Sequence, residues 1–191
     1  MSLIFKKHLE KFIPLEEITY QEVIGFFEII NVKKKENLMK EGDFCKYHFF
    51  VEKGCLRKFF IKNSGIEQTT EFALDQWWMT DTFAFERKVQ STFYIQAVES
   101  SVVLRISHDN REALLAKFPL MEQYFRMVYQ RAYAAAERRI RFLYEFSREE
   151  LYLHFANHYP EFIQRIPQYL LASFLGFTPE YLSEIRNKIR S

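Results

Sequence analysis

His154 and His158 lie four residues apart in a segment that we expect to be helical, a spacing at which two imidazoles can share a metal ion. His48 and Glu52 give part of the pattern with which a strand binds a catalytic metal, but Phe50 stands where a second histidine is needed. Neither pair has an evident third ligand, and catalytic metal sites usually take three ligands from the protein. We therefore expect no metal and no metal-dependent catalysis.

Other routes to catalysis lack their signature in this sequence. We find no Gly-rich phosphate loop and no G-x-S-x-G nucleophile elbow. Cys45 and Cys55 are too few for a disulfide framework and are not spaced as a C-x-x-C site. The sequence therefore predicts a protein that is not an enzyme and that uses no cofactor.

Composition indicates a folded chain. Of 191 residues 48% are hydrophobic and 18% aromatic, against 5 Gly and 5 Pro, which argues against disorder. The formal net charge of +2 does not by itself point to nucleic acid. Charges at positions 6, 7, 10 and 11 argue against a signal peptide, and no apolar run approaches 18 residues. We expect a cytoplasmic protein with no membrane partner.

The segment RIPQYLLASFLGFTPEYLSEIRNKI has the residue pattern of a helix-turn-helix. Gly176 is placed at the turn, where φ becomes positive, and Ala172 stands four residues earlier, where the two helices approach. Thr178 can cap the second helix, with Pro179 in its first turn. The five positions that this motif buries are all apolar: Leu171, Leu175, Phe177, Leu182 and Ile185. An ordinary helical hairpin packed on the rest of the chain is the alternative.

In a helix-turn-helix the second helix enters the major groove of DNA and reads base edges. Glu180 or Glu184 can accept a hydrogen bond from cytosine, and Arg186 can contact guanine or phosphate. The candidate DNA-binding residues are those expected to face outward: Thr178, Glu180, Tyr181, Ser183, Glu184, Arg186, Asn187 and Lys188.

The segments upstream of this motif must position it, and along the chain their sequence pattern changes from one typical of strands to one typical of helices. An amphipathic helix is expected over 15–27, and short apolar runs separated by turn signals predict strands between about 29 and 106. Residues 55–74 have the pattern of a long hairpin with Asn63-Ser64-Gly65 at its tip. So many short strands predict a sandwich or jelly roll.

From residue 109 the pattern is helical. Residues 118–146 lack glycine and repeat apolar residues at spacings of three and four, which predicts one long helix. It either covers the sheet or pairs with its twin in a homodimer, and its length favours pairing. Shorter helices are expected over 148–158, 167–176 and 179–189. Arginines recur along these helices, and we interpret them as a solvated face. In the alternative interpretation Arg138, Arg139 and Arg141 act at a hinge.

This order of elements resembles the CRP/FNR family of bacterial transcription regulators. LMKEGDFCKYHFFVEKGCLRKFF is similar to the family's early sensor hairpins, and LASFLGFTPEYLSEIRNKI to its DNA-reading unit. The resemblance implies an α+β chain with a jelly-roll, cyclic-nucleotide-binding-like sensor domain over 1–117, a dimerisation helix over 118–146 and a helix-turn-helix domain over 147–191. It also implies a homodimer that binds double-stranded DNA at a near-palindromic operator.

The candidate ligand pocket departs from the family pattern. Where cyclic-nucleotide binders carry Gly-Glu and Arg-Ser, this chain has Thr80-Asp81 and Ser91-Thr92. Without its arginine the phosphate would be left unpaired, so we expect no cyclic nucleotide. Trp78, Thr80, Asp81, Ser91 and Thr92 are the candidate pocket residues for an unknown small-molecule effector.

The aromatic residues near this pocket have two interpretations. Trp77, Trp78, Phe83 and Phe85 either fill the pocket as core or line a site for an apolar effector. Cys45 and Cys55 cannot supply the four thiolates of an iron–sulfur cluster within one chain.

The DNA-reading unit departs from the family as well. The chain ends at Ser191, so we expect a helix-turn-helix without the full family wing, and Glu180 and Glu184 imply a different operator. The alternative function is a ligand-binding or interaction module whose degenerate helix-turn-helix does not read DNA.

Overall fold

The computed structural model describes residues 2–190, except for the side chains of residues 18, 189 and 190. The chain divides into two compact units. The first contains residues 1–60 and 71–131, and the second contains residues 61–70 and 132–191. The ends of the expected domains at Met1 and Ser191 lie outside the described residues.

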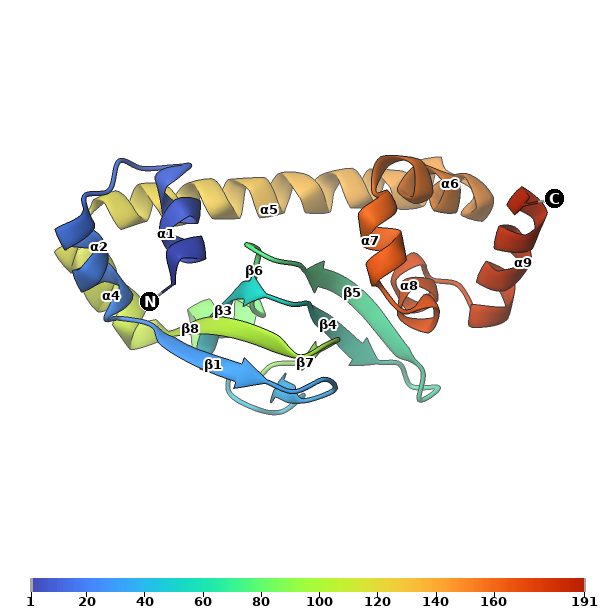
Figure 1. The fold of residues 1–191 in the computed structure, drawn as a ribbon. Coiled ribbons are helices and arrows are strands. Elements are labelled where there is room, and N and C mark those ends of the chain that lie inside the picture. Colours follow the sequence, from blue (N-terminus) through green and yellow to red (C-terminus); the bar gives the residue numbers. More distant parts are fainter. Residues whose placement is uncertain (1, 191) are drawn as a thin grey trace. The chain divides into compact units, whose positions relative to one another are not determined.

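Two four-stranded sheets face each other, with strand orders β1-β8-β3-β6 and β2-β7-β4-β5, and all but residues 61–70 of the β4–β5 hairpin belong to the first unit (Figure 1). The strands are β1 Glu28–Val32, β2 Asn37–Met39, β3 Tyr47–Lys53, β4 Leu56–Ile61, β5 Glu67–Ala73, β6 Trp78–Met79, β7 Tyr94–Ala97 and β8 Ser101–Ser107. The predicted jelly-roll-like sandwich is confirmed, and only the short strands β2 and β6 were not expected.

Alternation along the strands produces the core between the sheets. In β3 the register pairs Phe50 with Leu104 and Val51 with Val103 of β8, so successive residues face opposite sides of the sheet. The side chains that fill the space between the sheets include Val32, Met39, Phe49, Val51, Leu56, Met79, Phe85, Ile95 and Val103. Each of these is at most 5% exposed.

Helices cover the other face of the β1-β8-β3-β6 sheet. They are α1 Leu3–Glu10, α2 Glu17–Ile24, α4 His108–Lys117 and the first part of α5 Leu120–Glu145, while α3 Thr82–Arg87 follows β6. The second core lies here and includes Phe5, Leu9, Tyr20, Phe27, Phe50, Trp78, Leu104, Ile106, Leu114, Tyr124 and Phe125. The long helix predicted over 118–146 is confirmed as a single helix of 26 residues.

A chain of hydrogen bonds ties α1 and α5 to the sheet inside this second core. The indole N–H of Trp78 donates to the hydroxyl oxygen of Tyr124 at 2.7 Å, and that hydroxyl lies 2.8 Å from Nδ1 of His8. Burial raises the pKa of Tyr124 and lowers the pKa of His8 to about 4. The imidazole is therefore neutral, and its Nδ1 accepts a hydrogen bond from the hydroxyl of Tyr124.

The second unit contains the remainder of α5 and four further described helices (Figure 1). They are α6 Arg148–His158, α7 Pro160–Arg165, α8 Gln168–Leu175 and α9 Pro179–Arg190. Ser147 and Glu150 form a capping box that begins α6. Helices 148–158, 167–176 and 179–189 were predicted to within about one residue, whereas α7 was not expected.

The buried histidines predict how stability depends on pH. Burial is the main cause that lowers the pKa of His48 to about 3, so His48 and His8 both stay neutral in the folded protein. In the unfolded chain both take up protons as the pH falls through about 6.5. The free energy of unfolding should therefore decrease from pH 7 to pH 4.5, by up to about 1.4 kcal/mol per pH unit for each histidine.

Urea denaturation at several pH values measures this slope. His48→Phe keeps a ring in the aromatic surroundings of His48 and should remove about half of the decrease between pH 6.5 and 4.5. His158→Gln changes an exposed histidine and serves as the control. A slope that is the same in His48→Phe and in the wild type would contradict the assignment.

Candidate functional site

The C-terminal helices have the geometry of a helix-turn-helix. Gly176 follows α8 with φ 79° and ψ 26°, and the N–H of Phe177 donates to the carbonyl of Ala172 at 2.8 Å. The hydroxyl of Thr178 accepts the N–H of Tyr181 at 3.2 Å, which caps the start of α9. The predicted buried positions are confirmed: Leu171, Leu175, Phe177, Leu182 and Ile185 are each at most 9% exposed.

Six of the eight candidate DNA-binding residues are exposed, namely Thr178, Glu180, Ser183, Glu184, Asn187 and Lys188. Tyr181 and Arg186 are only partly exposed. The rings of Tyr181 and Phe177 pack edge to face with centroids 5.6 Å apart, and the guanidinium carbon of Arg148 lies 5.5 Å from the centre of the Tyr181 ring. Tyr181 therefore contributes to packing within the unit as well as to the outward face of α9.

The tip of the β4–β5 hairpin packs on α8 in the second unit. The hydroxyl of Ser173 accepts the N–H of Thr69 at 2.8 Å and donates to the carbonyl of Glu67 at 2.8 Å. The Gln68 side chain donates to the carbonyl of Ser173. The hydroxyl of Ser173, in the first helix of the motif, thus hydrogen-bonds one backbone N–H and one backbone carbonyl of a segment about a hundred residues earlier.

Arg139 of α5 completes this junction. Its guanidinium donates to the carbonyl of Thr70 and, at 2.8 Å, to that of Phe174, and it lies 3.9 Å from the centre of the Phe174 ring. A cation is favourable there because the last carbonyls of α8 carry a partial negative charge. The interpretation of Arg139 as part of a solvated face is wrong, whereas Arg141 does pair with Glu145 four residues later.

Three of the candidate pocket residues come together in the first unit. The carboxylate of Asp81 accepts the hydroxyl of Ser91 at 2.7 Å and the N–H of Ala84 at 3.2 Å, which caps α3. Thr80 donates to the carbonyl of Tyr47 at 3.0 Å and lies 3.2 Å from the sulfur of Cys45. Thr80, Asp81 and Ser91 are all buried, so their polar groups are satisfied by one another and by nearby backbone.

The other two candidate pocket residues lie apart from these three. Trp78 belongs to the core between the helices and the sheet, and Thr92 is exposed. Among the neighbouring aromatic residues Phe85 is fully buried, whereas Trp77 and Phe83 are 56% and 65% exposed. The expectation that Trp77 and Phe83 fill a core is therefore wrong.

A cation that the sequence analysis missed lies beside the candidate pocket. The ammonium of Lys58 in β4 pairs with the carboxylate of Glu71 at 2.6 Å and donates to the carbonyl of Thr80 at 3.0 Å. Its side chain is only 15% exposed. Alternation along β4 places Lys58 on the same face as the buried Leu56, which is the signal that could have identified it.

The histidines considered as metal ligands have other contacts. The rings of His154 and His158 stack with centroids 4.2 Å apart, and Nδ1 of His158 donates to the carbonyl of His154 at 2.9 Å. His48 is buried and stacks on Tyr129. Among the described residues no group of three or more His, Cys, Asp or Glu side chains is placed to hold a metal ion.

Residues 29–118 match the family model described as a cyclic nucleotide-binding domain. No curated protein matches the sequence. Solved structures are similar in fold over most of the chain. FixK2 from Bradyrhizobium japonicum is 16% identical, with 86% of this chain and 84% of that chain covered and a TM-score of 0.71.

Two further structures are similar over nearly the whole chain. The regulator CLP from Xanthomonas campestris, described as c-di-GMP-responsive, is 14% identical over 92% of both chains, with a TM-score of 0.70. A CRP/FNR-family protein from Eubacterium rectale is 14% identical, with 92% of this chain and 84% of that chain covered and a TM-score of 0.70. In the described residues no helix is both long and apolar enough to cross a membrane.

Residues 29–118 therefore have the β-sandwich fold of a cyclic nucleotide-binding domain, and a long helix and C-terminal helices follow. The chain as a whole has the fold of the CRP/FNR transcription regulators.

The junction at Ser173 yields a prediction about local stability. Ser173→Ala leaves the buried N–H of Thr69 without its acceptor, which costs about 1–3 kcal/mol. Amide hydrogen exchange over residues 62–70 should accelerate by about tenfold or more, because opening of the tip becomes easier. Ser183→Ala, on the exposed face of α9, should leave it unchanged. Equal protection of the tip in Ser173→Ala and in the wild type would show that this hydroxyl does not hold the hairpin.

Proposed function

We propose that this protein is a homodimeric, sequence-specific DNA-binding transcription regulator of the CRP/FNR type that acts in the cytoplasm and catalyses no reaction. The observation that carries the proposal is the outward face of α9, where Glu180, Ser183, Glu184 and Asn187 are all exposed. Acceptors and amides of this kind can hydrogen-bond base edges in the major groove. The fold shared with transcription regulators supports the same proposal.

An exposed apolar stripe on α5 supports the homodimer. Tyr133, Ile140 and Tyr144 are 66%, 55% and 89% exposed, and their spacings of seven and four place them on one face of the helix. Leu143, 49% exposed, extends the stripe. Pairing with the same stripe of a second copy would remove these side chains from water, as in a coiled coil.

The interior of the first unit supports an effector other than a cyclic nucleotide. Asp81 presents a carboxylate where the family resemblance would require the ribose-binding glutamate, and Ser91 stands where it would require the phosphate-binding arginine. Both side chains are already hydrogen-bonded to each other. A cyclic phosphate placed beside Asp81 would be repelled by that carboxylate, and the nearby Lys58 ammonium is already paired with Glu71.

Selection from randomised duplex DNA tests the function directly. The wild type should enrich a near-palindromic site with half-sites about 34 Å apart, and its affinity should fall steeply with salt. Glu180→Ala should relax the preference at one base pair in each half-site, by about 1–3 kcal/mol, without changing the helical content. Glu161→Ala, exposed on α7, is the control and should leave the selected sequence unchanged. A folded dimer that enriches no sequence at low salt would contradict the proposal and favour an interaction module that does not read DNA.

Charge introduced into the α5 stripe tests the dimer separately. Ile140→Glu brings two like charges together across the proposed interface, so light scattering should show a monomer and DNA affinity should fall at least tenfold. Arg138→Glu introduces the same side chain on a face of α5 turned well away from this stripe and should remain dimeric. Dimeric Ile140→Glu with wild-type affinity would exclude this stripe as the interface.

A further inference from the structure

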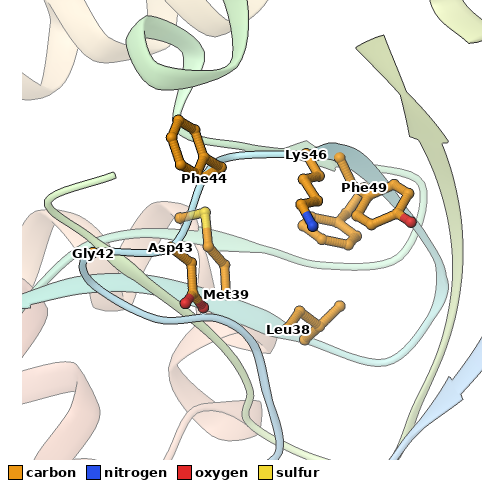
Figure 2. Close-up of a pocket in the computed structure, with 8 residues that line it drawn as sticks. Leu38, Met39, Gly42, Asp43, Phe44, Lys46 and Phe49 are labelled. Atoms are coloured by element: carbon orange, nitrogen blue, oxygen red, sulfur yellow. The ribbon is translucent and has the colours of Figure 1, made fainter. Parts of the chain in front are cut away.

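A hollow of about 450 Å³ lies between β2 and the start of β3, in the first unit (Figure 2). Its size is within the usual range of pockets for small molecules. The residues that line it are Leu38, Met39, Gly42, Asp43, Phe44, Lys46, Tyr47 and Phe49. The pocket is separate from the candidate effector residues Thr80, Asp81 and Ser91, none of which lines it.

The walls of this pocket combine apolar and aromatic side chains with polar ones, and part of the inner wall is buried. Met39 and Phe49 are 5% and 2% exposed and belong to the core between the sheets, so the inner wall is held by packing. Phe44 is 56% exposed at the rim, where an occupant would cover part of its ring. A thioether and aromatic faces of this kind favour a flat or branched apolar body.

One exposed cation, Lys46, lines the hollow. Figure 2 shows the side chain of Lys46 directed among the lining side chains. Within the part of the chain that the structure describes, its ammonium has no ion pair and no side-chain hydrogen bond. The nearby carboxylate of Asp43 accepts the backbone N–H of Lys40 at 2.9 Å and so is held by its own turn. An anion on the occupant would give Lys46 the partner that it lacks.

We propose that this pocket binds a small organic anion with an aromatic or branched apolar body and a single carboxylate or sulfonate group. A nucleotide fits less well, because several phosphate charges would face one ammonium and the Asp43 carboxylate. The proposal concerns binding by the first unit alone and does not depend on whether the protein reads DNA.

The backbone around the pocket connects it to the candidate effector residues. The N–H of Gly42 donates to the carbonyl of Ser91 at 2.8 Å, and the N–H of Ser91 donates to the carbonyl of Asp43 at 2.9 Å. Tyr47 accepts the hydroxyl of Thr80 through its carbonyl. An occupant that shifts the turn at 42–44 therefore displaces the backbone of Ser91, whose side chain holds Asp81 at the start of α3.

Titration of the isotope-labelled full-length protein with 1-naphthoate, followed by amide NMR without DNA, tests the proposal. We expect saturable shifts concentrated in residues 38–49 and affinity about 3–10-fold higher than for the neutral analogue 1-naphthalenemethanol, as one partly exposed ion pair contributes. Lys46→Gln should remove this preference for the anion, whereas Lys40→Gln, an exposed lysine of the same turn that does not line the pocket, should keep it.

A second variant tests the sign of the charge effect. Asp43→Asn retains a side-chain oxygen for the N–H of Lys40 and removes one negative charge, so naphthoate affinity should rise by about 2–3-fold. The proposal is overturned if residues 38–49 do not shift at millimolar naphthoate, if the neutral analogue binds equally well, or if Lys46→Gln binds naphthoate as the wild type does. Each of these outcomes leaves the proposed DNA binding unaffected, because that is measured separately.

Discussion

The hydroxyl of Tyr124 is the interaction on which the arrangement of the first unit depends. It is completely buried, accepts the Trp78 indole and donates to the neutral imidazole of His8. A tyrosine hydroxyl can be buried at little cost only when its hydrogen bonds are made. Because its partners come from β6 and α1, this hydroxyl fixes which face of α5 lies against the sheet and where α1 lies beside it.

The packing around Tyr124 accounts for part of the high aromatic content of the chain. Aromatic residues make up 18% of the chain, and the rings of Phe125, Phe5 and Trp78 lie around Tyr124 at centroid distances of 5.2, 6.3 and 6.4 Å. Large flat side chains fill the space between helices and a sheet with few rotatable bonds. With the first part of α5 fixed in this way, its remaining turns carry Arg139 and the exposed apolar stripe into the second unit.

Elements with long, regular patterns could be predicted from the sequence. The six longer strands, the single long helix and the five buried positions around Gly176 follow from periodicity and from one glycine at a positive φ. The short strands β2 and β6 and the six-residue helix α7 have too few residues for a period to emerge. Their formation depends on partners elsewhere in the chain, such as β7 for β2 and β3 for β6.

The functional contacts were harder to predict for the same reason. Nothing local to Ser173 or Arg139 indicates that they bind the backbone of residues 67–70, since each pattern fits an ordinary exposed helix position. The candidate pocket residues Asp81 and Ser91 do lie together, but they hydrogen-bond to each other, and Thr80 donates to the carbonyl of Tyr47. An effector bound there must first separate Ser91 from Asp81 and offer both a replacement partner, whereas Lys46 offers an unpaired charge at once. The cost of breaking the Ser91–Asp81 hydrogen bond therefore favours a ligand that binds beside the turn at 42–44. Such a ligand affects Asp81 indirectly, through the backbone hydrogen bonds between this turn and Ser91.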